Sequence, residues 1–549
     1  MAFVAAMNSA ATKAGVKGSD VYTEVGVGDQ RVVLFQMLVR GLSHKEIRRI
    51  LYNAPEEHLV DYLVMAFQTR DVRGGKGEKV LFYEMLDVLF ARRPDWIVPA
   101  VELIPTYGYW KDLWVMYERM WIADETNGRA VRLAINALVK RQFEADMTAE
   151  RPSLLAKWLP REKSAGRKLA RRFAGFLFGH VEGGDDEKLA AYRKAVAALN
   201  KKLATVEIAM CGAAWRSIKP SAVPGRCLMK NRKAFLLQHK HAKLVAHLED
   251  RIACRDRFVA HISGGGAVKG AGVVYPHEIV MRLLHREVDA DEQSLLEGQW
   301  LAIREAAAAA GGFRRIVPMC DFSGSMNGIP LVVSLALGIL VSEIATPAFK
   351  DYILGFDSNP SWISLKDCGS LKEKIDWAIR HAQGTSTDFQ AACDLVLKRL
   401  VECAVPADEA PEDLLVFTDM GFDMACDAGV RSGFTGKSYG HVVKSEVWQT
   451  HCQMIRSSFE AAGYKAPRIV LWNLRAAYND FHAKADETGV LLLSGWSPAI
   501  LKVIQSKGIE VENPYDALRA LLDDARYDAV RAIASTAGGA GAVAAAAST

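Results

Sequence analysis

The stretch RRIVPMCDFSGSM, residues 314–326, decides the fold of the C-terminal part of this chain. Its first seven residues, two arginines followed by the apolar run IVPMC, predict a buried strand, and the polar loop DFSGS at 321–325 follows directly. An apolar segment then predicts a helix over 331–345. A strand, a polar loop and a helix in this order are typical of an open α/β sheet, which binds ligands beyond the carboxyl ends of its strands.

The residues after this stretch repeat the alternation of strand and helix. We predict strands at 351–356, 414–419, 468–474 and 490–495, and helices at 371–383, 388–403, 446–462 and 499–508. Short apolar strands that alternate with helices predict a doubly wound, mainly parallel, Rossmann-like sheet. We assign this α/β domain to residues 306–528, and we expect the Ala/Gly-rich segment 529–549 to be a disordered tail.

The residues before the sheet have a different pattern. Apolar residues recur at helical spacing, as in 57–70, 78–93 and 111–121, and strand signals are nearly absent. Short loops between these segments predict antiparallel helix pairs, so we expect an all-α, HEAT-like array over residues 1–305. No clean repeat of 34 or 40 residues is present, so this prediction depends on helix length and loop spacing. A chain of 549 residues is also too long for one core, which predicts a multidomain protein.

Cysteine usage and hydropathy limit the class of protein. The nine cysteines include no C-x-x-C pair and no H-E-x-x-H motif is present, so we expect reduced cysteines and no structural zinc. The longest apolar run, 329–341, is shorter than the roughly 20 residues that cross a bilayer. The N-terminus lacks the basic region of a secretory signal. We therefore expect a cytoplasmic protein that does not enter membranes.

Oxygen-bearing side chains follow three of the predicted structural junctions. Asp321, Ser323 and Ser325 follow the first strand, Thr385 precedes a helix, and Asp419 ends the strand at 414–419. Two carboxylates and several hydroxyls, with no imidazole or thiolate, form a ligand set that suits Mg²⁺ or Mn²⁺. The alternative is that these residues only cap helices and turns.

A basic zone lies in the helical part. Residues 151–250 contain 21 Lys and Arg against 8 Asp and Glu, and four aromatic residues, Trp158, Phe173, Trp215 and Phe235, lie among them. Cations for phosphates and rings for base stacking are what single-stranded RNA requires. The alternative is a set of solvated helix faces with the rings in the core. The candidate RNA-binding residues are Arg161, Lys163, Arg167, Lys168, Arg171, Arg172, Arg226, Lys230, Arg232, Lys233 and Lys240.

The motifs DFSGSM, GTST and VFTD, in this order and spacing, resemble the metal-ion-dependent adhesion site of von Willebrand factor A domains. The resemblance implies that Ser323, Ser325 and Thr385 bind the metal directly, and that Asp321 and Asp419 act through water. It also implies an open coordination position that accepts a carboxylate from a partner protein.

The layout of a helical array followed by such a domain resembles the TROVE proteins, the Ro autoantigens, which bind small noncoding RNAs. The blocks QTRDVRGGKGEK, YGYWKDL, LAKWLP, SAVPGR, PHEIV, VLWNLR and SGWSPAILK, spread over residues 68–503, are most similar to an uncharacterised TROVE-related family that ends in a von Willebrand A module. That resemblance implies fold and metal site but no established role.

Three functions are therefore open at this point. The first is a Ro-like ribonucleoprotein component whose basic helical array binds noncoding or single-stranded RNA, while the metal site docks a partner. The second is a non-enzymatic interaction scaffold that uses the metal site alone. The third is a metal-dependent phosphoester hydrolase, which we do not expect because two-metal sites need clustered carboxylates. The sequence does not identify the RNA, the partner or the oligomeric state.

Overall fold

A computed structural model describes residues 11–14, 20–123, 125–163, 166–238, 248–264, 266, 274–285, 288–309, 315–357, 359–381, 387–422, 451–505 and 511–535. Its contacts group the chain into two compact units. The first unit comprises Met1–Ile50, Gly74–Lys76 and Gly270–Asp524, and the second comprises Leu51–Arg73, Gly77–Lys269 and Ala525–Thr549. The two compact units are therefore interleaved in sequence, and the division into residues 1–305 and 306–528 remains a prediction.

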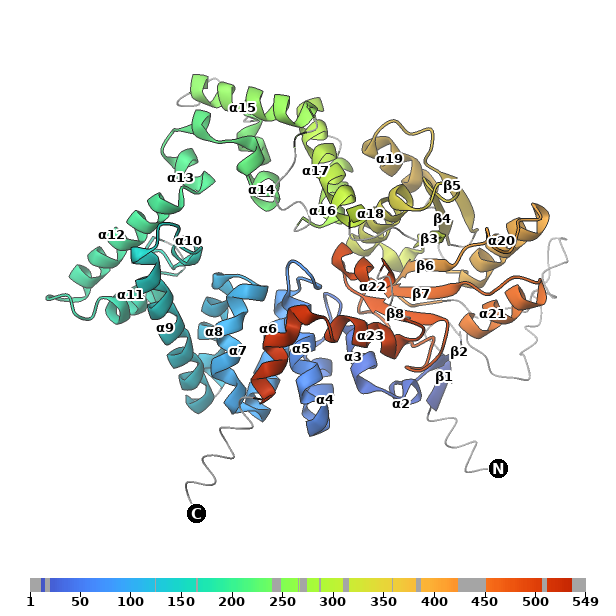
Figure 1. The fold of residues 1–549 in the computed structure, drawn as a ribbon, viewed down its shortest axis with the longest axis horizontal. Helices are drawn as coiled ribbons and strands as arrows, with labels where there is room; N and C mark the ends of the chain where they lie inside the picture. Colours follow the sequence, from blue (N-terminus) through green and yellow to red (C-terminus); the bar gives the residue numbers. More distant parts are fainter. Residues whose placement is uncertain are drawn as a thin grey trace, which may run out of the picture. The chain divides into compact units, whose positions relative to one another are not determined.

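The first unit contains a mixed sheet of six strands in the order β5-β4-β3-β6-β7-β8 (Figure 1). The pairs that join β4, β3, β6, β7 and β8 are parallel, and only β5 is antiparallel, at one edge. The strands are β3 (Ile316–Asp321), β4 (Tyr352–Phe356), β5 (Ser361–Ser364), β6 (Asp413–Thr418), β7 (Arg468–Asn473) and β8 (Val490–Ser494). The predicted mainly parallel sheet is confirmed at this level, and β5 was missed.

Helices cover both faces of this sheet, which explains why β3 and β6 are buried along their whole length. Cys320 points toward α18 (Ile329–Ile344), where a Cβ on Gly338 would lie 2.3 Å from the Cys320 sulfur, so only glycine permits this close approach. Phe356 contacts Phe389 of α20 (Phe389–Glu402) with ring centroids 6.0 Å apart. Successive strand residues face opposite sides, so α18 and α20 cover opposite faces.

The remaining elements of the first unit come from both ends of its sequence. Its other helices are α2 (Glu24–Val27), α3 (Gln30–Met37), α16 (Pro276–Leu283), α17 (Ala290–Ala309), α19 (Leu371–His381), α21 (His451–Ala461), α22 (Lys502–Gln505) and α23 (Pro514–Leu522). A short antiparallel pair, β1 (Thr12–Ala14) and β2 (Asp20–Tyr22), precedes them. The chain passes to the second unit within α4 (His44–Tyr52).

Lys76 joins the N-terminal helix α3 to the sheet. Its side chain is fully buried, and its ammonium group donates to the carbonyls of Phe35 at 2.8 Å and Leu38 at 3.1 Å. It also donates at 2.6 Å to the hydroxyl of Ser494, the last residue of β8. The loop 73–79 therefore supplies a structural cation that holds elements more than 400 residues apart in sequence.

The second unit is helical in its described residues. Its helices are α5 (Leu59–Arg70), α6 (Lys79–Arg92), α7 (Ile97–Tyr107), α8 (Trp110–Ala123), α9 (Glu125–Thr148), α10 (Leu155–Trp158), α11 (Arg167–Leu177), α12 (Asp185–Leu203), α13 (Val206–Cys211), α14 (Gly225–Phe235) and α15 (Leu248–Ser263). Sequence neighbours pack in pairs, such as α5 with α6 and α11 with α12. The expected helical content of this region is confirmed, whereas a repeat architecture remains a prediction.

Two buried carboxylates hold the core of the helical unit. Asp112 accepts from the guanidinium of Arg70 at 2.6 Å and from the hydroxyl of Tyr83 at 2.6 Å. Asp71 accepts from Arg526 at 2.8 Å and from the Tyr527 hydroxyl at 3.1 Å. The second cluster fixes the end of the chain to this unit.

The segment predicted as a tail therefore begins in ordered structure. Residues 528–535 are helical, and the side chains of Val530 and Ile533 are buried. Residues 536–549, which contain the Ala/Gly-rich end, lie outside the described residues.

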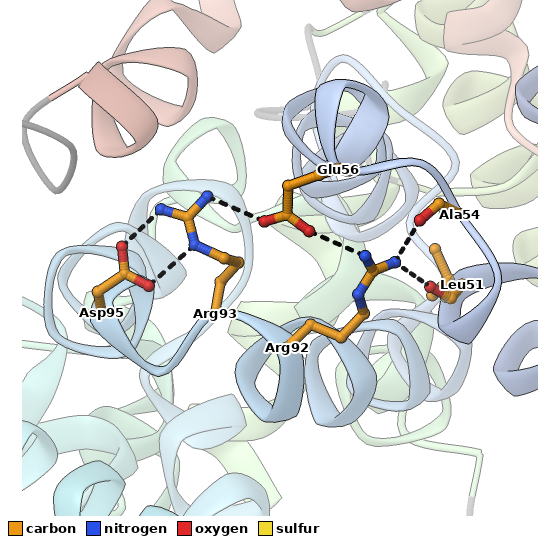
Figure 2. A network of polar contacts seen from close by, with 6 residues as sticks. All are labelled: Leu51, Ala54, Glu56, Arg92, Arg93 and Asp95. Carbon is orange, nitrogen blue, oxygen red and sulfur yellow. Dashed lines mark hydrogen bonds and ion pairs between the residues drawn. The ribbon is translucent and has the colours of Figure 1, made fainter.

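A polar network joins the C-terminal end of α6 to the residues at and after the C-terminal end of α4 (Figure 2). Arg92 donates to the carbonyls of Leu51 and Ala54 at 2.9 and 2.6 Å, and it pairs with Glu56 at 2.9 Å. Glu56 also lies 3.5 Å from Arg93. Leu51 lies in the last turn of α4 and Ala54 follows that helix, where carbonyls lack helical donors, so the Arg92 guanidinium supplies them. In the described part of the chain, no helix is both long enough and apolar enough to span a membrane.

Candidate functional site

The candidate metal site lies where the strand order of the sheet reverses. The chain runs from β3 outward to β4 and β5 on one side, and from β6 outward to β7 and β8 on the other. Asp321 is the last residue of β3 and Thr418 is the last residue of β6, and these strands are direct neighbours. Such a switch point opens a crevice at the carboxyl edge of a parallel sheet, which is where ligands bind.

Hydrogen bonds hold Asp321 in one orientation. One carboxylate oxygen accepts from the backbone amide of Ser323 at 2.9 Å, and the other accepts from the hydroxyl of Thr418 at 2.7 Å. The hydroxyls of Ser323 and Ser325 lie 3.1 Å apart, so both serine oxygens face one another beside this carboxylate. The structure thus brings together three of the predicted ligands from the loop after β3.

Asp419 comes from the neighbouring strand end and is fully buried. One carboxylate oxygen accepts from the amide of Gly421 at 3.2 Å. Within the described residues the other oxygen, Oδ2, has no hydrogen-bond partner although it is inaccessible to solvent. A buried carboxylate oxygen without a donor is costly, so this atom indicates a missing ligand such as a cation.

The electrostatics of the crevice favour the same interpretation. Burial and, after it, the nearby Asp419 carboxylate raise the pKa of Asp321 to about 7, although hydrogen bonds from Ser323 and Thr418 oppose the rise. Two carboxylates in one dry crevice repel each other when both are ionised. A divalent cation between them would remove that repulsion.

Two residues that the sequence patterns did not predict, Arg475 and Tyr478, also lie at the candidate metal site. Arg475 donates through Nη1 to the backbone carbonyl of Ser325. Tyr478 lies against Gly421, where a Cβ would come within 2.6 Å of the ring, and its hydroxyl interacts with the Ser325 side chain. Burial and the charge of Asp419 raise the pKa of Tyr478.

Both of these residues follow β7, and the strand-end rule that selected Asp321 would have selected them. Arg475 is exposed, so it places a cation at the mouth of the crevice.

The predicted ligand Thr385 lies outside the described residues. Thr387, two positions later, is fully buried, and Asp388 caps α20 by accepting from the amide of Ala391 at 2.8 Å. In the part of the chain that the structure describes, no three His, Cys, Asp or Glu side chains gather as metal ligands, so a cation here would also need the serine hydroxyls. Carboxylate and hydroxyl oxygens are ligands that fit a magnesium ion.

The first basic cluster comprises the cations of residues 161–172, of which four lie on one exposed face of α11 and two lie in the loop before it. α11 buries Leu169, Ala170, Phe173 and Ala174, and its charged residues point to solvent. The exposed cations of this cluster are Arg161, Lys163, Arg167, Lys168, Arg171 and Arg172. Helical spacing therefore separates an apolar stripe from a basic face.

The second cluster is less exposed. Arg226, Lys230 and Lys233 are exposed on α14, but Arg232 is half-buried and donates to the carbonyl of Met229 at 2.9 Å. The predicted residue Lys240 lies outside the described residues. The described part of this cluster thus offers three exposed cations.

Three of the four aromatic residues in the basic zone are core residues. Phe173 packs edge-on against Trp114 at 5.0 Å, and Phe235 stacks on Phe258 at 4.5 Å. Trp215 is also buried, and Trp158 is half-buried. The expectation that these rings form a platform for RNA bases is wrong for the three buried rings, because they supply the apolar stripe on which the basic helices pack.

The chain is similar to proteins whose role is not described. Residues 315–531 match the family model "Domain of unknown function (DUF7788)". "Uncharacterized protein L728" of Acanthamoeba polyphaga mimivirus is 27% identical over 475 residues, which cover 83% of this chain and 78% of that protein. That alignment is longer than the domain match, so the similarity extends into the helical region. No solved structure matches the chain.

Proposed function

We propose that this chain is an RNA-binding protein whose helical unit binds noncoding or single-stranded RNA through the exposed face of α11. The observation that carries the proposal is the placement of Arg167, Lys168, Arg171 and Arg172, which are all exposed on a helix whose apolar residues are buried. Lys and Arg side chains that replace the counterions of phosphates supply most of the affinity for a nucleic acid backbone.

The proposed architecture is a TROVE-like helical array followed by a von Willebrand A-like domain. The motif resemblance supports it, as do the helical character of the second unit and the strand order of the first. The buried aromatic rings shift the expected binding mode from base stacking on α11 to phosphate contact along it.

RNA copurification from native lysate tests the proposal. We expect the tagged full-length protein to enrich a defined set of small RNAs at low salt and to lose them as the salt concentration rises. Charge reversal of Arg167, Lys168, Arg171 and Arg172 together should remove the enrichment. RNA recovery at background level, or recovery that neither salt nor the reversal changes, would overturn RNA binding.

A second candidate function is docking of a protein partner through a divalent cation. The observation that favours it is the buried, unpartnered Oδ2 of Asp419 beside Asp321. Asp321, Ser323, Ser325 and Asp419 would hold Mg²⁺, with Thr385 as the fifth predicted ligand, and the cation would supply a coordination position for a partner carboxylate. Arg475 at the mouth adds a positive charge that attracts such a carboxylate.

Asp321→Ala separates the two candidates. If the cation docks a partner, this variant loses the proteins that copurify with the wild type in Mg²⁺ and keeps its RNA. Partner proteins that are recovered equally with the variant, or in the presence of EDTA, would contradict metal-dependent docking.

A further inference from the structure

The segment that begins at Tyr478 joins the N-terminal part of the chain to the candidate metal site. We call residues 478–482 the bridging segment. Its two ends contact the residues that follow Asp419, and its middle contacts β1 and β2. All of these residues belong to the first compact unit. The bridging segment therefore places the start of the chain directly behind the candidate metal site.

His482, the last residue of the bridging segment, holds the backbone next to Asp419. Its side chain is fully buried, and its Nε2 lies 3.0 Å from the carbonyl oxygen of Met420. A carbonyl oxygen only accepts, so Nε2 carries the hydrogen and donates it. Met420 has a φ of 72°, a left-handed conformation that is strained for a residue with a side chain, and its amide donates to the hydroxyl of Thr418 at 3.1 Å. The His482 bond thus helps to fix a strained turn directly after Asp419.

Ring contacts hold the same turn from both ends of the bridging segment. The ring of His482 lies 4.5 Å from the ring of Phe422, measured between centroids. At the other end, the ring of Tyr478 lies so close to Gly421 that a Cβ on this glycine would come within 2.6 Å of it. A displacement of the bridging segment would therefore also displace the turn that carries the Asp419 carboxylate.

Residues of β1 and β2 bond the middle of the bridging segment. Lys13 of β1 donates to the carbonyl of Asn479 at 2.7 Å, and it forms an ion pair with the buried carboxylate of Asp480 at 3.0 Å. The amide of Tyr22, the last residue of β2, donates to the carbonyl of Phe481 at 2.7 Å. The three bonded residues are consecutive, so β1 and β2 hold the whole middle of the bridging segment in place.

We infer that Lys13 is a positioning residue of the metal site, and that docking of β1 and β2 on the bridging segment raises the affinity of the site for Mg²⁺. The inference rests on the proposed metal site. Lys13 acts through the bridging segment, which keeps the turn after Asp419 in the conformation that turns this carboxylate into the crevice. Replacement of residues that orient metal ligands from behind typically lowers metal affinity about 10- to 100-fold.

Calorimetric titration with Mg²⁺ compares the full-length wild type with three variants. Lys13→Met removes the charge and both bonds, and it should weaken Mg²⁺ binding about tenfold. The Lys13 side chain is 38% exposed, so its replacement leaves the core intact. Lys13→Arg keeps a cation at this position and should retain most of the affinity. Lys465→Met is the matched control, because this exposed lysine precedes β7 at the opposite edge of the sheet, and its affinity should equal that of the wild type.

The outcomes separate the inference from the metal site itself. A wild type that does not bind Mg²⁺ would overturn the metal site and the inference together. Wild-type binding that Lys13→Met leaves unchanged would overturn the inference alone, and so would an equal loss of affinity in Lys465→Met.

Hydrogen exchange adds a readout that a loss of general stability would not move. Linkage is reciprocal, so Mg²⁺ must strengthen the docking of β1 and β2 by the factor by which docking strengthens Mg²⁺ binding. The amide of Tyr22 should therefore exchange about tenfold more slowly when the wild type is saturated with Mg²⁺. Asp419→Asn should show no such difference. Exchange at Tyr22 that Mg²⁺ does not slow in the wild type would overturn the coupling.

Discussion

Two pairs of buried carboxylates, one pair in each unit of this protein, have different hydrogen-bond partners. In the helical unit, Asp71 and Asp112 are buried, and each accepts from an arginine guanidinium as well as a tyrosine hydroxyl. In the α/β unit, Asp321 and Asp419 are equally buried. Among the described residues, hydroxyl and amide donors alone bond this second pair, and one oxygen has no donor.

This difference distinguishes buried carboxylates that stabilise the fold from buried carboxylates that can bind a ligand. A buried carboxylate with its own arginine completes a fold, because the charge is neutralised where it lies. Two buried carboxylates to which, among the described residues, no arginine or lysine is bonded leave a negative charge that a ligand can neutralise. This comparison, more than any single motif, supports a divalent cation at the carboxyl edge of the sheet.

The largest expected effect comes from removing the carboxylate of the buried ion pair between Arg70 and Asp112. Asp112→Ala leaves the Arg70 guanidinium buried without its carboxylate, so we expect the free energy of unfolding to fall by about 3–5 kcal/mol. Chemical denaturation monitored by circular dichroism measures this loss.

The matched control for that change is Asp419→Asn in EDTA. Removing one of two repelling carboxylates should leave the free energy of unfolding unchanged or raise it. If Asp419→Asn destabilises the protein as strongly as Asp112→Ala does, the distinction between the two kinds of buried carboxylate fails.

The next largest expected effect is a pH dependence of the free energy of unfolding. The folded-state pKa of Asp321, about 7, lies above its ordinary value, so between those values the folded state holds a proton that the unfolded state releases. Without divalent cations, the wild type should therefore lose stability relative to Asp321→Asn by about 1.4 kcal/mol per pH unit as pH rises toward 7. A difference between the two proteins that is constant from pH 5 to pH 7 would contradict the raised pKa.

A smaller effect should follow from a substitution of Tyr478. The Tyr478 hydroxyl interacts with the Ser325 side chain. When the Ser325 oxygen binds a cation, its hydroxyl hydrogen points away from the cation, and the Tyr478 oxygen can accept a hydrogen bond from it. Tyr478→Phe keeps the ring against Gly421 and removes only that hydroxyl, so we expect Mg²⁺ affinity to fall about tenfold. Calorimetric titration measures the affinity, and an unchanged Kd would show that the hydroxyl does not support Ser325.

The smallest effect belongs to one exposed cation of the helical unit. Lys168→Gln should weaken RNA binding uniformly and reduce the slope of log Kd against log salt concentration by about 1. Anisotropy at several salt concentrations measures the slope. An unchanged slope would remove Lys168 from the phosphate contacts, and unfolding data should show no loss of stability because the side chain is exposed.

The strand-end rule explains how much of the site was predictable. Asp321 and the Thr418 hydroxyl are 97 residues apart in sequence and 2.7 Å apart in space, because parallel strands end at one edge. The short strand β5 was missed because its four residues form a half-buried edge that a hydrophobic pattern does not mark.

Sequence patterns could not predict polar contacts between residues far apart in the chain, or which aromatic rings are buried. Lys76 in a glycine-rich loop gives no local sign that it bonds the end of β8. Spacing on a helix also cannot tell a ring for base stacking from a core ring, and Phe173 and Phe235 belong to the core. Only the packing of neighbouring helices decides between those roles.

Titration of the full-length wild type and Asp419→Asn with Mg²⁺, after removal of divalent cations with EDTA and dialysis, tests the central claim most directly. We expect one calorimetric Mg²⁺ site in the wild type, a higher midpoint of thermal unfolding in Mg²⁺, and the loss of both in Asp419→Asn while the apo variant stays folded. A wild type that binds no Mg²⁺, or a variant that binds it as well as the wild type, would contradict a cation site formed by Asp321 and Asp419.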